Sequence, residues 1–222
     1  MILQWIGLAA SVGAGYLAIR WLLNRYDSLG RTRSFPSIAV GGLIVIALAC
    51  LVPFFLRVRL EGKLETASSA IVGAPVEVDC QAFGEAFVDA GMELGYVRFG
   101  PDGVPEPRTL IKRQQCRDLS DYIAGGHSDL VHEQVVAVHT LTHEAIHMSG
   151  VTSEAETECV AMQRDAEMAR LLGADPADAM SLARYYWDNV YPRMPSPYSS
   201  EDCRDNGPLD RDLPDAPWDP VS

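Results

Sequence analysis

The sequence predicts a mainly helical α+β protein, in which a hairpin of two transmembrane helices precedes a helical domain with a small β element. Two apolar runs near the start and several helix-length segments in the second half support this fold class. Residues 1–64 carry seven Lys or Arg against two Asp or Glu, a net charge of +5. Residues 65–222 carry 11 against 28, a net charge of −17. So acidic a domain repels phosphate, which excludes nucleic acid as a partner.

Each apolar run is long enough for one membrane crossing. The runs cover residues 2–23 and 37–56, and a helix needs about 20 apolar residues to cross a bilayer. A cleaved signal peptide is the alternative for the first run, but its positive charges follow the run instead of preceding it. We therefore expect residues 1–56 to form a multi-pass hairpin in the lipid of the cell membrane. Gly7, Ser11 and Gly15 are expected to form its helix-packing face, with ordinary use of small residues in membrane helices as the alternative.

The cysteines bear on the orientation of the hairpin, which the basic residues on either side of the second run leave open. Cys50 lies inside the second run, and the other four lie in the acidic part of the chain: Cys80, Cys116, Cys159 and Cys203. Their even number and the absence of zinc-knuckle spacing predict two disulfides, with four free thiols as the alternative. Disulfides require an oxidising compartment, so we expect the soluble part on the extracytoplasmic side.

The pairing follows from two helices expected at residues 153–172 and 176–190. A short turn joins them, so they should lie antiparallel. The chain that leaves the second helix then returns beside Cys159, within reach of Cys203. This pairing leaves Cys80 and Cys116 as the second disulfide.

The soluble part is expected to contain a juxtamembrane linker at residues 57–75, a domain at 76–206 and a disordered acidic tail at 207–222. Pro105 and Pro107 indicate a loop. Alternating patterns predict strands at residues 76–79 and 92–99, with a turn at 100–103. Further helices are expected at residues 81–90, 110–123 and 129–148. Ser153 and Asp175 are the expected N-caps of the last two helices.

Residues 143–147 read His-Glu-Ala-Ile-His, an HExxH motif on an apolar helix. Residues four apart share a helix face, so His143 and His147 can direct their imidazoles at one zinc ion. Glu144 then reaches the water that the zinc activates and can serve as the general base of hydrolysis. The alternative is a helix that carries two surface histidines.

Three glutamates after the motif are candidates for a third zinc ligand: Glu154, Glu156 and Glu158. Glu156 fits a capping box with Ser153, which gives it a structural role. Glu154 is nearest to the histidines if the second helix folds back after Gly150. Glu158, one turn further, could accept an N–H from a ligand histidine, or could itself be the ligand. The remaining interpretation is that these glutamates are solvent-exposed acids at the start of a helix, where the helix dipole favours negative charge.

The segment from residue 143 to 163 resembles the gluzincin-type metallopeptidases, in particular the compact bacterial HtpX and ImmA/IrrE kinds. It is also similar to uncharacterised membrane-anchored bacterial proteins with this motif. The resemblance covers roughly residues 130–190 and implies a zincin-like domain with Glu154 as zinc ligand and Glu158 as support. The chain departs from the family in the short gap between His147 and Glu154 and in Thr157, where a small Ala is usual. A metzincin reading is weak, because its third ligand would fall on Ser153.

Two functions are expected to compete: a zinc metallopeptidase acting on a peptide or protein substrate, and a non-catalytic metal-binding ectodomain of an envelope assembly. Glu144 favours the enzyme, because a structural site needs no base. The expected strand at residues 92–99 could receive substrate as an added strand. His139 could line the cleft or be an ordinary polar helix residue. Tyr185, Tyr186 and Tyr191 could supply the donor that zincins often place on the transition-state oxyanion, but such a run more often serves core packing. His127 and His132 are expected to be surface residues. The oligomeric state is left open.

Overall fold

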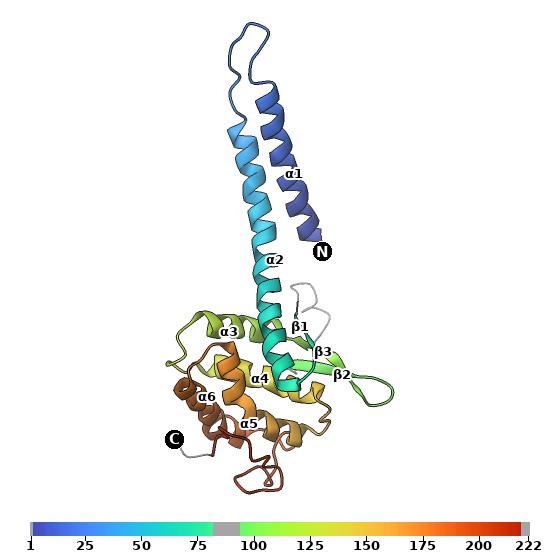
Figure 1. Cartoon of the computed structure of the whole chain (residues 1–222), viewed down its shortest axis with the longest axis vertical. Coiled ribbons are helices and arrows are strands. Elements are labelled where there is room, and N and C mark those ends of the chain that lie inside the picture. The colour runs from blue at the N-terminus through green and yellow to red at the C-terminus, as the bar shows by residue number, and fades with distance from the viewer. Residues whose placement is uncertain (1, 82–93, 219–222) are drawn as a thin grey trace. The chain divides into compact units, whose positions relative to one another are not determined.

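A computed structural model describes residues 2–81 and 94–218 of the chain (Figure 1). The chain divides into two compact units, Met1–Arg59 and Leu60–Ser222. The structure is mainly helical with a small β element, as the sequence predicts, and its sheet has three strands instead of the two expected. The helix expected at residues 81–90 falls almost wholly outside the described residues.

The first unit contains helix α1 (Ile2–Leu23) and the first part of helix α2 (Ser37–Val72). Both helices are long and apolar enough to cross a membrane. Only 17% of the apolar window of α1 and 11% of that of α2 is buried within the chain. Large apolar side chains such as Trp5 and Ile38 are therefore exposed, as a lipid-facing surface requires.

The packing face of α1 differs from the expected Gly7, Ser11 and Gly15. Gly7 is buried, and a Cβ atom there would lie 2.7 Å from Leu51 of α2. Ala10 and Ala14 are the other buried residues of this face, while nothing lies within 4 Å of a Cβ at Gly15. The contact thus recurs at intervals of three and four residues, because a strict four-residue step drifts around a helix of 3.6 residues per turn.

The expected linker at residues 57–75 is also wrong, since α2 continues without a break to Val72. Leu64, Ala67 and Ile71 recur at helical spacing and are buried in the core of the second unit. The helix ends at Gly73, whose φ of +77° suits glycine and whose N–H donates to Ser69 O.

The sheet of the second unit has the order β1-β3-β2. β1 (Glu77–Cys80) lies parallel to β3 (Pro105–Ile111), and β2 (Gly95–Phe99) lies antiparallel to β3. The central strand β3 was not predicted, because a loop was expected at Pro105 and Pro107 and a helix from residue 110, whereas the helix begins only at Arg113. The pairing with β1 starts only at Arg108, so neither proline has to donate a hydrogen bond to β1. On the other side Pro105 pairs with Phe99 of β2, next to an irregularity in the register.

Four helices complete this unit: α3 (Arg113–Ala124), α4 (His132–Met148), α5 (Glu154–Leu172) and α6 (Pro176–Asn189). A short 3-10 helix, η2 (Tyr191–Arg193), follows them. The side chains of Ser153 and Asp175 cap α5 and α6, as predicted. α4 is the central helix, because it packs against β2, β3, α3, α5 and α6. Its buried position places the motif at the centre of the unit.

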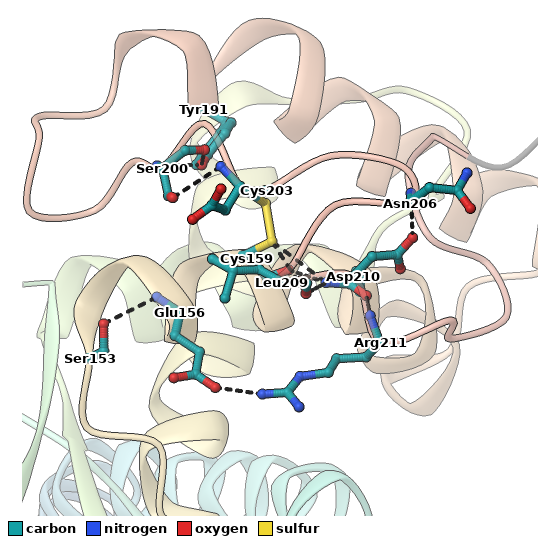
Figure 2. The surroundings of a disulfide bond; sticks show 12 residues. Ser153, Glu156, Cys159, Tyr191, Ser200, Cys203, Asn206, Leu209, Asp210 and Arg211 are labelled. Carbon is teal, nitrogen blue, oxygen red and sulfur yellow. Dashed lines mark hydrogen bonds and ion pairs between the residues drawn. A yellow bond between two sulfur atoms is a disulfide. The ribbon is translucent and has the colours of Figure 1, made fainter.

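Both predicted disulfides are present, Cys80–Cys116 and Cys159–Cys203, and Cys50 is free. The first ties β1 to α3. The second ties α5 to the chain after η2, close to the C-terminal segment (Figure 2).

The C-terminal segment is not a disordered tail as far as residue 218. Ala216 is buried, and Leu209 and Trp218 pack against the core. The N–H of Arg211 donates to Gln163 Oε1 of α5 over 2.8 Å, and its guanidinium pairs with Glu156 (Figure 2). These contacts order the segment, although its polar composition predicts disorder.

Candidate metal centre

Helices α4 and α5 bring three ligand atoms together. His143 Nε2 lies 3.0 Å from His147 Nε2, and Glu154 Oε2 lies 3.2 Å and 3.3 Å from these two atoms. Both histidines are buried, whereas the Glu154 side chain is 41% exposed. The three residues form one of two groups in the described chain that could hold a metal ion.

The spacing of these atoms fits a zinc ion. Zinc bonds to His nitrogen and carboxylate oxygen are about 2.0–2.2 Å long, so the ligand atoms of a tetrahedral site lie about 3.3–3.5 Å apart. The observed separations of 3.0–3.3 Å are close to this value. Nitrogen and carboxylate donors of this kind suit zinc and also other divalent transition metals, so the donor set does not by itself identify the metal.

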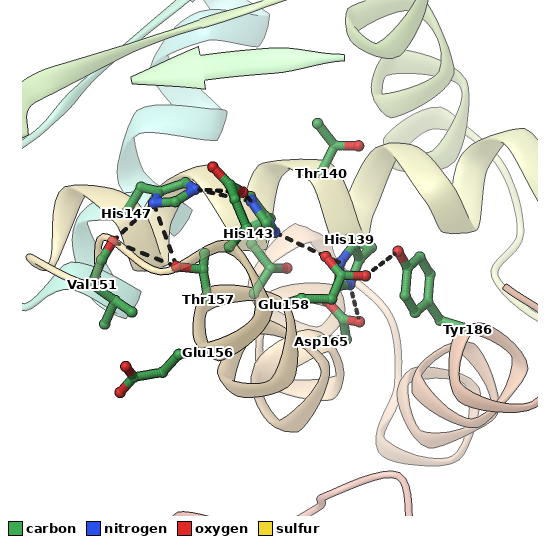
Figure 3. A network of polar contacts seen from close by, with 12 residues as sticks. His139, Thr140, His143, His147, Val151, Glu156, Thr157, Glu158, Asp165 and Tyr186 are labelled. Atoms are coloured by element: carbon green, nitrogen blue, oxygen red, sulfur yellow. Dashed lines mark hydrogen bonds and ion pairs between the residues drawn. The ribbon is translucent and has the colours of Figure 1, made fainter. Parts of the chain in front are cut away.

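The orientation of each imidazole is fixed through its Nδ1 atom (Figure 3). His147 Nδ1 lies 2.8 Å from Val151 O, which can only accept, so Nδ1 carries the hydrogen. His143 Nδ1 lies 3.0 Å from Glu158 Oε2, which is likewise an acceptor when ionised. In both rings the Nε2 lone pair is therefore left for a metal ion.

The short gap between His147 and Glu154 is closed by a tight turn. Gly150 has a φ of +106°, which favours glycine, and its N–H donates to His147 O over 2.9 Å. The Thr157 hydroxyl lies 3.4 Å from His147 Nδ1 and 3.5 Å from Val151 O. A threonine at this position adds a polar neighbour to the contact that orients His147.

Glu144 lies beside the three ligands and close to strand β2. A Cβ atom at Gly95 would lie 3.0 Å from Glu144 Cγ and 3.1 Å from Glu144 Oε1. Glycine is thus the residue that lets β2 approach the Glu144 side chain without a clash. Glu144 is buried and also lines the cleft.

The cleft above these residues has a volume of about 650 Å³. It is lined by residues of the edge strand β2 and by residues of the chain from the end of α6 past η2, including Val190, Met194 and Tyr198. The Tyr198 and Phe99 rings lie 6.0 Å from those of His143 and His147 respectively, measured between centroids. The ligand atoms therefore sit on the floor of a largely apolar cavity that can admit a molecule larger than water.

The carboxylates around His143 favour a positive charge at this point. Burial alone would lower the pKa of His143, but hydrogen bonds with Glu154 and Glu158 outweigh it and raise the pKa to about 9. The pKa of His147 is lowered, by burial and by the neighbouring His143. Hydrogen bonding to His143 holds the pKa of Glu154 below its usual range. A proton or a metal cation can supply the charge that the carboxylates attract.

A second polar cluster lies beside His143, on the side away from His147, and the sequence pointed to it only in part (Figure 3). Glu158, expected as the support of His143, also accepts from Tyr186 Oη over 2.7 Å. His139 Nε2 lies 3.1 Å from Glu158, and His139 Nδ1 lies 2.8 Å from Asp165. His139 is buried and faces the cleft, so the cleft reading of this residue holds. Asp165 was missed, although its spacing from Glu158 on α5 is a helical signal.

The remaining candidates lie away from the ligand atoms. His132 is exposed as expected, and its Nδ1 lies 3.4 Å from Tyr185 Oη. His127 is half-buried rather than a plain surface residue. The Tyr191 hydroxyl donates to Ser200 O and accepts from Ser200 N, which supports a structural role.

Comparisons of the chain with protein-family models, with curated proteins and with solved structures each find no match.

Proposed function

We propose that this chain is a membrane-anchored, zinc-dependent metallopeptidase that hydrolyses a peptide or protein substrate. The observation that carries the proposal is the convergence of His143 Nε2, His147 Nε2 and Glu154 Oε2 at 3.0–3.3 Å, beside Glu144 in one cleft. Three protein ligands at an open cleft are typical of a catalytic zinc, whereas structural zinc sites are closed by four. The arrangement therefore favours an enzyme over a purely structural metal site.

The chain's own residues have separate tasks in this reaction. When bound, zinc lowers the pKa of a water ligand to about 7 and polarises a carbonyl group. Glu144 takes a proton from the attacking water and later delivers it to the leaving amine. Glu158 and Val151 hold the His143 and His147 rings through their Nδ1 atoms. The apolar walls of the cleft exclude bulk water, which strengthens these electrostatic interactions.

The substrate is proposed to bind in extended form along β2. This strand is at the edge of the sheet, since the order is β1-β3-β2, and Gly95, Tyr96 and Val97 all line the cleft. An edge strand can pair its backbone with a peptide in the manner of an added strand. The Phe99 ring next to His147 offers an apolar contact on the same side.

The soluble unit is proposed to lie on the extracytoplasmic side of the cell membrane, anchored by the two apolar helices. The observation behind the sidedness is the pair of disulfides, because such bonds persist in oxidising compartments. Non-reducing peptide mapping of protein taken from native membranes tests it. Free thiols at Cys80 and Cys116 and at Cys159 and Cys203 would place the unit in the cytoplasm instead.

The metal site is tested with the full chain purified in detergent. His147→Ala should lose zinc, whereas His132→Ala, an exposed histidine on the same helix, should keep one zinc per chain. Equal zinc content in the two variants would refute the site.

The base is tested on the same preparation. Glu144→Gln should keep zinc and lose hydrolysis of a peptide library, because an amide cannot accept the proton. Glu133→Gln, an exposed position on α4, is the matched control. Undiminished turnover by Glu144→Gln would contradict the assignment, and one bound zinc with no turnover by the wild type would favour the non-catalytic ectodomain.

A further inference from the structure

The polar cluster beside His143 consists of four side chains with almost no exposure to solvent. The exposed fraction is 3% for His139, 1% for Glu158, 0% for Asp165 and 2% for Tyr186. The burial of two carboxylates in one place is costly unless each is paired. Apolar residues of similar size would fill the same space without that cost, so the polar cluster needs a reason other than packing.

The contacts within the cluster converge on one carboxylate. Glu158 Oε1 accepts from Tyr186 Oη, and Glu158 Oε2 faces both His143 Nδ1 at 3.0 Å and His139 Nε2 at 3.1 Å. His139 is held in turn by Asp165 at 2.8 Å and by stacking on the Tyr186 ring, with centroids 3.6 Å apart. Both oxygens of Glu158 are thus fixed in place from α4 and α6, although Glu158 itself belongs to α5.

We propose that His139, Asp165 and Tyr186 are positioning residues that fix the Glu158 carboxylate and, through it, the ring of His143. The proposal rests on the proposed function, because the value of a fixed His143 ring is the direction of its Nε2 lone pair. Partners of this kind, one step removed from a metal ligand, set the orientation and basicity of that ligand. Their loss is expected to weaken metal binding about 10- to 100-fold.

The alternative is that the same atoms bind a second metal ion. His139, His143 and Glu158 also form a group that could hold an ion. However, His143 would then have to bind a cation at each ring nitrogen and give up the hydrogen that Nδ1 donates to Glu158. Tyr186 Oη already donates to Glu158 Oε1, so only Oε2 of this carboxylate faces the two histidines. Positioning therefore predicts one metal ion per chain, and a second site predicts two.

The test is the zinc affinity of the full chain in detergent, measured by competition with a chelator. Tyr186→Phe keeps the ring that stacks on His139 and removes only the hydroxyl that donates to Glu158. It should raise the zinc Kd about 10- to 100-fold. Tyr191→Phe is the matched control, because its buried hydroxyl bonds to the Ser200 backbone instead. Asp165→Asn should weaken zinc binding in the same range.

A merely structural role would lower stability without a change in the metal site. The visible spectrum of the cobalt-substituted protein reports ligand geometry, and it should change in Tyr186→Phe but not in Tyr191→Phe. Wild-type affinity and spectrum in Tyr186→Phe, or two zinc ions per wild-type chain, would overturn the proposal. If Asp165→Asn does not fold, the Tyr186→Phe result decides alone.

The outcome is separable from that of the proposed function. Loss of zinc in His147→Ala, together with unchanged affinity in Tyr186→Phe, refutes the positioning role and leaves the metallopeptidase intact. Retention of zinc in His147→Ala refutes the metal site itself.

Discussion

Gly95 is the position at which the smallest substitution should disturb the proposed catalytic base. In Gly95→Ala the new methyl carbon would lie 3.0 Å from both Glu144 Cγ and Ile111 Cδ1. Attractive carbon–carbon contacts lie at about 3.5–4.0 Å, so these neighbours have to withdraw by about 0.5 Å. Ile111 is fully buried in the core, whereas Glu144 borders the cleft. Most of the shift should therefore fall on the Glu144 side chain.

The expected effect on catalysis follows from the size of this shift. A displacement of about 1 Å in a catalytic group can cost about 100-fold in rate. A shift of half that distance predicts a kcat about 10-fold lower. The zinc content should stay at the wild-type level, because Glu144 is not one of the three ligand residues. An added methyl group in a packed region typically costs about 1–3 kcal/mol of stability, so the protein should still fold.

The assay compares kcat, KM and zinc content of Gly95→Ala with those of Gly126→Ala. The second variant makes the same change where nothing lies within 4 Å of the new atom, and it should match the wild type. A wild-type kcat in Gly95→Ala would refute the reasoning. A raised KM with unchanged kcat would also refute it, since the methyl group would then obstruct the substrate and leave Glu144 in place.

Three further predictions concern stability. The Cys159–Cys203 bond closes a loop with a sequence separation of 44. Cys203→Ser should therefore lower the unfolding free energy by about 4 kcal/mol, measured in a denaturant titration. A loss below about 1 kcal/mol would show that the C-terminal contacts suffice without the disulfide. Asp175 accepts from the N–H groups of Ala177 and Asp178, so Asp175→Ala should cost about 1 kcal/mol, and an unchanged denaturation midpoint would contradict the capping role. Removal of zinc by a chelator should lower the thermal midpoint, because a ligand at 1,000 times its Kd stabilises by about 4 kcal/mol. His147→Ala should show no such shift.

The convergence of His143, His147 and Glu154 could be predicted because its signals are local. His143 and His147 are one helical turn apart, and the Ser149–Gly150 turn brings Glu154 back within a few residues. The disulfide pairing likewise followed from the antiparallel order of α5 and α6. In each case the geometry of one helix or one short turn was enough to bring the residues together.

The errors occurred where contacts distant in the sequence determine the structure. Residues 60–72 resemble a linker in composition, but their apolar side chains meet a core formed by residues far along the chain. The prolines of β3 do not interrupt its pairing with β1, because β1 pairs with the later part of the strand. The segment after residue 206 is polar, yet the side chain of Gln163 provides a partner for its backbone. Composition alone contains no information about these partners.

Helix α5 connects the predicted and the unpredicted parts of the soluble unit. At about 100° per residue, three of its five acidic residues, Glu154, Glu158 and Asp165, fall within about 40° of one another on one face. Cys159 and Gln163 fall on the opposite face, where the disulfide and the C-terminal segment contact the helix (Figure 2). The disulfide and the C-terminal segment therefore hold one face of the helix, while the opposite face carries the three carboxylates toward α4. Such support matters for a metal centre, because ligand atoms have to be held within about 0.5 Å of their productive positions.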